Sequence, residues 1–239
     1  MVKELLDMIY PRRCPICGDI VIPKGEKACP DCKALLQVIK EPRCKRCSKP
    51  IENEEKEYCY DCATKHFHYS RGYALWIYDK NMRKSIGDFK YHNRKEYADF
   101  YIEELLKYYE ESLKEIGADA FIPIPIHKSK LKIRGFNQAQ ILALGLGKAL
   151  GIKVIDDLLI RDKRTLPQKG LNDRERLKNL SQAFSVDKSK IKAYDNINKV
   201  ILVDDIYTTG STIEACTNIL QQNGVSEVYY VSLSIGKGF

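Results

Sequence analysis

The sequence predicts an α/β protein in which a mostly parallel sheet with flanking helices follows a small cysteine-rich module. From residue 69 to residue 239, segments with strand and helix periodicity alternate, which is typical of parallel sheets covered by their crossover helices. Eight of the nine cysteines lie in the first 62 residues, where apolar side chains are too few for an independent core. We therefore expect two domains, residues 1–68, opening with a short helix, and residues 69–239.

The cysteines of the first domain form a tandem repeat. Two Cys-x-x-Cys pairs separated by 11 residues make one unit, and the unit recurs after 30 residues. Each pair directs two sulfurs at one ion, and four thiolates favour a tetrahedral, structural zinc site without an open position. We expect each unit to hold its own zinc, because the duplicated unit is then complete, although a cross-braced pairing has the same spacing. The expected ligands are Cys14, Cys17, Cys29 and Cys32, and then Cys44, Cys47, Cys59 and Cys62.

The second domain opens with a strand at residues 73–78, where the side chains are mostly apolar. Two amphipathic helices follow at residues 81–91 and 95–116, and Gly117 ends the second of them. Residues 120–125 form the next strand, and its two prolines place its end at a margin of the sheet.

Helical periodicity returns at residues 135–150, and Gly151 is the expected stop of this helix. A short apolar segment covers residues 153–160. Residues 161–179 are polar, basic and weakly patterned, so we expect a long loop that leads into a short helix. Loops of this length inside a domain are more often functional than accidental.

The last section has the clearest pattern. Residues 199–204 form a buried strand, residues 211–223 form a helix closed by Gly224, and residues 227–235 form the final strand. Cys216 stands among apolar residues of this helix and is expected to fill the core rather than to react.

The positive charge is concentrated in one stretch. The chain carries 40 basic and 32 acidic side chains, a formal charge of +8, and residues 127–178 alone hold 13 basic and five acidic ones. This favours an anionic partner, phosphate or nucleic acid, over a merely solvated face. The most apolar stretch, residues 141–152, is too short to span a bilayer, and no export signal is recognised at the N-terminus, so we expect a cytoplasmic protein with reduced thiols.

The segment from Val200 to Thr212 predicts a phosphate site. It joins a strand to a helix through a turn in which backbone amides and hydroxyls can hold a phosphate dianion. The adjacent Asp204 and Asp205 suit ribose hydroxyls and Mg²⁺ instead. The expected phosphate ligands are Thr208, Thr209, Gly210, Ser211 and Thr212.

This segment resembles the phosphoribosyl-pyrophosphate (PRPP) signature of type I phosphoribosyltransferases. Together with the cysteine module, the chain from Pro11 onward resembles the ComF family (ComFC-like competence proteins), which joins a double zinc ribbon to such a domain. Further matching motifs are Lys90-Tyr91, Pro123-Ile-Pro125, Arg134-Gly-Phe-Asn-Gln138, Gln168-x-x-Leu171, Arg176-x-x-Asn179 and Ala183-Phe184.

The resemblance implies a type I phosphoribosyltransferase-like fold that binds PRPP with Mg²⁺. Asp204 and Asp205 would take the catalytic positions. Residues 208–212 would bind the 5-phosphate. The pyrophosphate would lie at Ile126, His127, Lys128 and Arg134, and a flexible loop would carry Arg161, Gln168, Arg176 and Asn179.

Two functions stay open at this point. The resemblance implies a factor for natural transformation and DNA uptake that handles single-stranded DNA, with a DNA translocase or helicase as a possible partner. Basic residues around the cysteine pairs and nearby aromatic side chains would suit stacked bases. The alternative is an active phosphoribosyltransferase with an unidentified acceptor, for which no acceptor pocket is readable. A PRPP-sensing transcriptional regulator would need a recognition helix, which the module does not offer. The candidate stacking residues are Tyr58, Tyr60, Phe67 and Tyr69.

Overall fold

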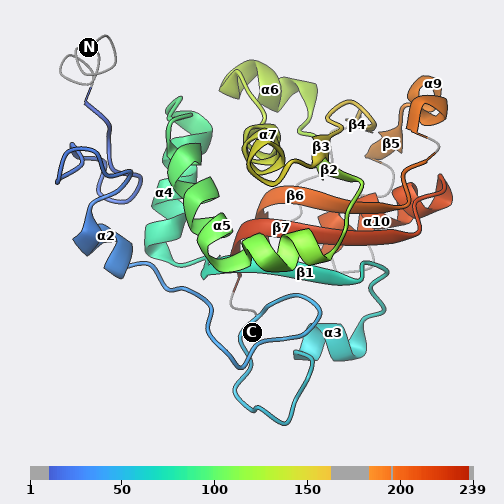
Figure 1. The fold of residues 1–239 in the computed structure, drawn as a ribbon, viewed down its shortest axis with the longest axis horizontal. Coiled ribbons are helices and arrows are strands. Elements are labelled where there is room, and N and C mark those ends of the chain that lie inside the picture. The colour runs from blue at the N-terminus through green and yellow to red at the C-terminus, as the bar shows by residue number, and fades with distance from the viewer. Residues whose placement is uncertain (1–10, 163–182, 195, 237–239) are drawn as a thin grey trace.

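A five-stranded sheet lies at the centre of the protein, as the computed structural model shows for residues 11–162, 183–194 and 196–236 (Figure 1). The strand order is β1-β7-β6-β2-β3, and every neighbouring pair is parallel. The short strands β4 and β5 form a separate antiparallel pair. The predicted class, a mostly parallel sheet with flanking helices, is confirmed. The strands are β1 Arg71–Ile77, β2 Ala120–Pro123, β3 Lys153–Val154, β4 Leu159–Arg161, β5 Phe184–Val186, β6 Lys199–Tyr207 and β7 Glu227–Ile235.

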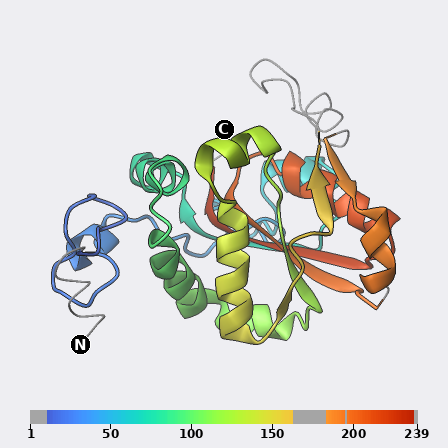
Figure 2. The same cartoon turned by 90° about the horizontal axis from the view of Figure 1, so that it is seen from above.

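Helices cover both faces of the sheet (Figures 1 and 2). Successive side chains of a strand point to opposite faces. Ile201 of β6 therefore packs with α4, α5 and α7, whereas Leu202 packs with α10. The helices are α4 Lys80–Tyr91, α5 Tyr97–Glu115, α6 Lys128–Arg134, α7 Gln138–Leu150 and α10 Ser211–Gln222, with the shorter α2 Pro30–Ala34, α3 Tyr60–Thr64, α9 Lys188–Ile191 and a 3-10 helix Lys192–Tyr194.

Strand β6 is longer than the sequence pattern predicts. The expected end was residue 204, where the apolar run stops, but pairing with β7 continues to Tyr207 opposite Ile235. The backbone does not need apolar side chains to keep its ladder, because the neighbouring strand supplies hydrogen-bond partners for every residue. Asp204 and Asp205 consequently lie inside the strand rather than in the turn after it.

The helix expected at residues 135–150 is α7, which begins three residues later, and a further helix that the sequence pattern did not predict precedes it. The first, α6, begins at Lys128, buries none of its residues, and ends at Gly135, whose φ of 76° breaks the helix. Because no residue of α6 is buried, no apolar stripe in its sequence indicates it. The second, α7, begins after Asn137, whose side chain accepts a hydrogen bond from the Ala139 amide.

The two cysteine units pack on opposite faces of the sheet. The first ribbon (residues 11–37) joins the buried cluster of α4 and α5 through Ile16 and Val21. The second ribbon (residues 41–65) joins the cluster of α10, with its cysteines next to Tyr69. Neither ribbon forms a core alone, as expected, but both share the cores of the main sheet. The domain boundary at residue 68 stays a prediction.

Several expected features fall on residues that are not described. The expected N-terminal helix falls within residues 1–10, and most of the expected loop at 161–179 falls within residues 163–182. Among the described residues, no helix is both long and apolar enough to cross a membrane.

Candidate functional site

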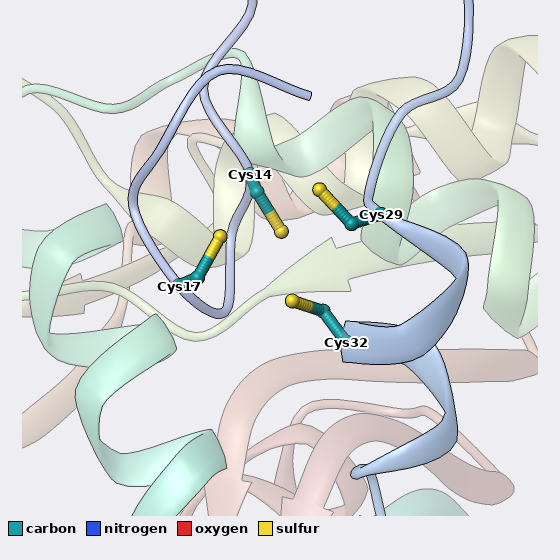
Figure 3. A group of neighbouring side chains, drawn as sticks. All are labelled: Cys14, Cys17, Cys29 and Cys32. Atoms are coloured by element: carbon teal, nitrogen blue, oxygen red, sulfur yellow. The ribbon is translucent and has the colours of Figure 1, made fainter. Parts of the chain in front are cut away.

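Each cysteine unit gathers its own four sulfurs into one cluster. Figure 3 shows the first of these clusters, which consists of Cys14, Cys17, Cys29 and Cys32. The Sγ atoms of a cluster all lie within 4.8 Å of one another, and those of Cys47 and Cys59 are 3.6 Å apart. A tetrahedral zinc ion with Zn–S bonds of about 2.3 Å would hold its sulfurs about 3.8 Å apart. The clusters therefore fit zinc, and the expected sequential arrangement, one unit for one ion, is confirmed.

The clusters differ in their exposure to solvent. All four cysteines of the second ribbon are buried, whereas Cys17 of the first ribbon is exposed and Cys29 and Cys32 are partly so. In the second cluster, hydrogen bonds among the thiols lower the pKa of Cys44 and raise the pKa values of Cys47 and Cys62. A thiolate is the form that binds zinc, so a bound ion would displace the protons that this cluster retains.

We expect two zinc ions per chain that leave at different rates. A chelator such as EDTA should remove the ion of the first ribbon first, because solvent reaches Cys17. A colorimetric zinc indicator would record two phases of equal size. The Cys17→Ser variant should retain one ion and only the slow phase. Fewer than two ions per chain, or equal rates for both, would contradict this assignment.

The predicted phosphate turn connects β6 to α10. Gly210 precedes the helix with a φ of 79°, and a Cβ atom there would lie 2.3 Å from the Tyr207 hydroxyl oxygen. Thr209 Oγ1 and Ser211 Oγ are 2.9 Å apart. No side chain caps α10, so its first amides keep the hydrogen-bonding capacity that an anion can use.

The two acidic residues of β6 have different environments. Asp205 is paired with Lys90, from the last turn of α4, and both side chains are mostly buried. Asp204 Oδ1 accepts a hydrogen bond of 2.8 Å from the Asp205 amide. Burial and the neighbouring Asp205 carboxylate raise the pKa of Asp204 to about 8. At neutral pH, Asp204 is therefore mostly protonated in the unliganded protein.

Basic side chains from three elements converge on this end of the sheet. Lys130 of α6 has a lowered pKa because of partial burial and the like charges of Arg161 and Arg134. Arg134 donates to Tyr91 Oη at 2.7 Å and to Gln138 Oε1 at 2.9 Å. Like charges held this close repel one another, and a bound anion would relieve the repulsion.

Arg161, at the end of β4, connects this basic group to the acidic pair. Its guanidinium lies over the Phe184 ring, 4.9 Å from the centroid. Burial lowers the pKa of Arg161, and an ionised Asp204 would oppose this shift. Cys216 itself is fully buried, in agreement with the expected core role.

The sequence-predicted residues fall into three groups. Asp204, Arg134, Arg161 and their neighbours come together as described above. His127 caps α6 by accepting from the Ser129 amide, next to the partly buried Ile126, and Lys128 is exposed in the first turn of α6. The remaining loop residues lie outside the described part of the chain: Gln168, Arg176 and Asn179.

Two of the basic residues here were not among the predicted site residues. Lys90 lies far from β6 in the sequence, and only its place in the Lys90-Tyr91 motif pointed to a role. Lys130 stands in an alternating basic run in which no residue is distinguished by its neighbours. One expectation is wrong: Tyr69 is 1% exposed and cannot stack on a nucleic-acid base. Tyr58 and Tyr60 are exposed, and Phe67 is partly buried.

Comparison with known proteins agrees with the cysteine clusters. The model of the double zinc ribbon domain matches residues 5–63. Purine phosphoribosyltransferase from Pyrococcus horikoshii is a structural neighbour with 17% identity over 60% of this chain and 85% of that chain, but its TM-score is 0.33. An adenine phosphoribosyltransferase has the same identity and TM-score. Scores this low support no statement about activity.

Curated relatives extend beyond the ribbons. Competence protein F of Haemophilus influenzae is 37% identical over 110 residues, and the DNA utilization protein YhgH of Escherichia coli K12 is 29% identical over 110 residues. These matches cover 46% of this chain and about half the length of each relative. Competence protein ComFC of Streptococcus pneumoniae is 32% identical over 212 residues, 86% of either chain. The chain belongs to the ComF family of competence proteins.

Proposed function

We propose that this protein serves DNA uptake in natural transformation, handling single-stranded DNA in the cytoplasm, and that it binds PRPP with Mg²⁺ at the carboxyl end of β6. The first part is supported by relatives named for competence and DNA utilization. The second part is carried by one observation: the acidic pair of β6, the uncapped end of α10 and the converging basic residues all lie at the same end of the sheet.

Each of these groups would bind a different part of PRPP. The amides at the start of α10 and the hydroxyls of Thr209 and Ser211 would take the 5-phosphate. Lys130, Arg134 and Arg161 would surround the diphosphate, and its negative charge would relieve their mutual repulsion. Asp204 and Asp205 would face the ribose hydroxyls and hold Mg²⁺, which would neutralise part of the diphosphate charge.

The carboxylates of Asp204 and Asp205 are oxygen ligands of the kind that Mg²⁺ prefers. The Asp204 carboxyl holds its proton to about pH 8 because burial and the Asp205 carboxylate raise its pKa by more than Lys90 lowers it. A divalent ion at this position would favour the ionised form. We propose that the ion enters together with PRPP, since the basic residues repel a bare cation.

For DNA, the second ribbon offers the more suitable surface. The side chain of Tyr60 is 79% exposed, and the Arg46 guanidinium lies over the Tyr58 ring at 5.6 Å from the centroid. Stacked bases tolerate any sequence, as uptake of foreign strands requires. Three other cations of this ribbon already pair with carboxylates, which limits its net attraction for phosphates: Arg43 with Glu41, Lys45 with Glu57, and Lys49 with Asp61.

The test is the affinity for a fluorescent oligothymidine, measured with and without PRPP and Mg²⁺. We expect Tyr60→Ala to weaken binding about tenfold, the effect of losing one stacked base. The matched control is Tyr108→Ala, because Tyr108 is also exposed but lies on α5. Affinity should also fall with added salt. Absence of binding would refute the DNA-handling role and favour a transferase, which a PRPP-consumption screen with free bases would then examine.

A further inference from the structure

The second ribbon is connected to the phosphate turn through Tyr230 of β7. The Tyr230 hydroxyl donates a hydrogen bond of 3.0 Å to the carbonyl oxygen of Cys47, a residue of the second cluster. The ring of Tyr230 stacks on that of Tyr207, with centroids 4.9 Å apart and planes inclined by 6°. Tyr207 is the last residue of β6, directly before the turn. One buried side chain thus contacts both the cysteine cluster and the base of the turn.

Close packing leaves these rings little freedom. A Cβ atom at Gly72 would lie 2.0 Å from the Tyr230 ring, so β1 passes directly against it. On the other side, the Tyr207 hydroxyl is 2.7 Å from that of Tyr69 and lies under Gly210. A ring held on several sides cannot tilt without moving its neighbours. A displacement of the Cys47 carbonyl would therefore also displace Tyr207 and the turn.

A second connection reaches the first turn of α10. Glu214 is 3% exposed, and its carboxylate accepts a hydrogen bond of 2.9 Å from the His68 amide and contacts His68 Nδ1. His68 lies three residues after the end of the second ribbon. Phe67, its neighbour, stacks on Tyr69 with centroids 5.2 Å apart. The end of the second ribbon thus holds both the turn and the helix that follows it.

The first ribbon makes different contacts. Its knuckle carbonyls at Ile16 and Cys17 accept from Lys84 Nζ of α4, at 3.2 and 3.4 Å, and Arg12 pairs with Asp99 of α5. Both helices lie on the opposite face of the sheet from α10. The first ribbon therefore serves as an internal control for the second ribbon.

We propose that the second ribbon positions the phosphate turn, with Tyr230, Tyr207 and His68 as positioning residues, so that the intact second cysteine cluster sets the affinity of residues 208–212 for a phosphate group. The first ribbon has no such effect. This inference rests on the proposed PRPP site for its consequence, but the mechanical connection itself does not depend on any ligand.

The test compares Tyr230→Phe with Tyr101→Phe in the full zinc-loaded chain. Each change removes one buried hydroxyl and its hydrogen bond, since the Tyr101 hydroxyl contacts Ser85 Oγ at 2.6 Å. Hydrogen exchange of residues 208–214 would be measured by mass spectrometry, and affinity for PRPP with Mg²⁺ by calorimetry. We expect about tenfold faster exchange and about tenfold weaker binding for Tyr230→Phe, and changes below twofold for Tyr101→Phe.

Zinc removal gives a second, independent readout. The first zinc that a chelator removes should leave exchange at residues 208–214 unchanged, and the second should accelerate it. Exchange and affinity that are equal in Tyr230→Phe and the wild type would overturn the inference. If the wild type does not bind PRPP but exchange still responds to Tyr230→Phe, the proposed PRPP site fails and the positioning role stands.

Discussion

Asp204→Asn is expected to weaken PRPP binding at least about 100-fold while making the unliganded protein more stable. The loss follows from removing a carboxylate that would face Mg²⁺ and ribose, an effect of roughly 3 kcal/mol for charged hydrogen-bonded groups. The gain in stability follows from the pKa of Asp204, which burial and Asp205 raise from 3.8 to about 8. The folded state disfavours the ionised carboxyl, and asparagine at this position has no proton to lose.

The raised pKa of Asp204 determines how the free energy of unfolding changes with pH. Between about pH 4 and pH 8, the unfolded chain has lost the Asp204 proton and the folded chain retains it. The unfolded state thus binds fewer protons, so the contribution of Asp204 to the free energy of unfolding falls as pH rises through that window. Thermal unfolding of wild type and Asp204→Asn at several pH values would measure it. A stability difference that does not grow from pH 4 to pH 8 would contradict the pKa.

Gly210→Ala is expected to be the most damaging small substitution in the phosphate turn. A residue with a side chain is strained at a φ of 79°, and the new Cβ would overlap the Tyr207 hydroxyl. Because Tyr207 is packed between Tyr69 and Tyr230, it cannot move aside. We expect a loss of about 2–4 kcal/mol in unfolding free energy, the sum of strain and overpacking, with loss of PRPP binding.

Gly151→Ala is the matched control for that substitution. Gly151 has a φ of 69°, but a Cβ atom there meets nothing within 4 Å. It should therefore cost only the backbone strain, about 1 kcal/mol, and leave PRPP affinity intact. Chemical denaturation and calorimetry of both variants would separate the backbone strain from the overlap with the Tyr207 hydroxyl. Equal losses in the two variants would show that the contact with Tyr207 is unimportant.

Local patterns were sufficient to predict the sheet, its main helices and the cysteine clusters. The cysteine repeat specifies its own geometry, because each Cys-x-x-Cys knuckle is local. The strands at 199–204 and 227–235 are buried on both faces, so their apolar runs are unambiguous. Helix α6 was missed because its exposed surface leaves no periodic signal.

The features that connect distant segments could not be predicted in this way. The Lys90 pair with Asp205 joins residues 115 positions apart, and nothing in either local sequence indicates the partner. The burial of Tyr69 arises from Tyr207 and Tyr230, which reach it only when β1, β6 and β7 assemble. The connection of the second ribbon to the phosphate turn has the same origin, and only the folded structure reveals it.

The most direct measurement of the central claim is a calorimetric titration of PRPP into the zinc-loaded chain with Mg²⁺. At pH 7, we expect one PRPP per chain and release of a proton as Asp204 ionises, seen as a heat that varies with the ionisation enthalpy of the buffer. The double variant Asp204→Asn, Asp205→Asn should show no binding. Absence of binding by the wild type, or equal affinity in the double variant, would contradict the assignment of the site.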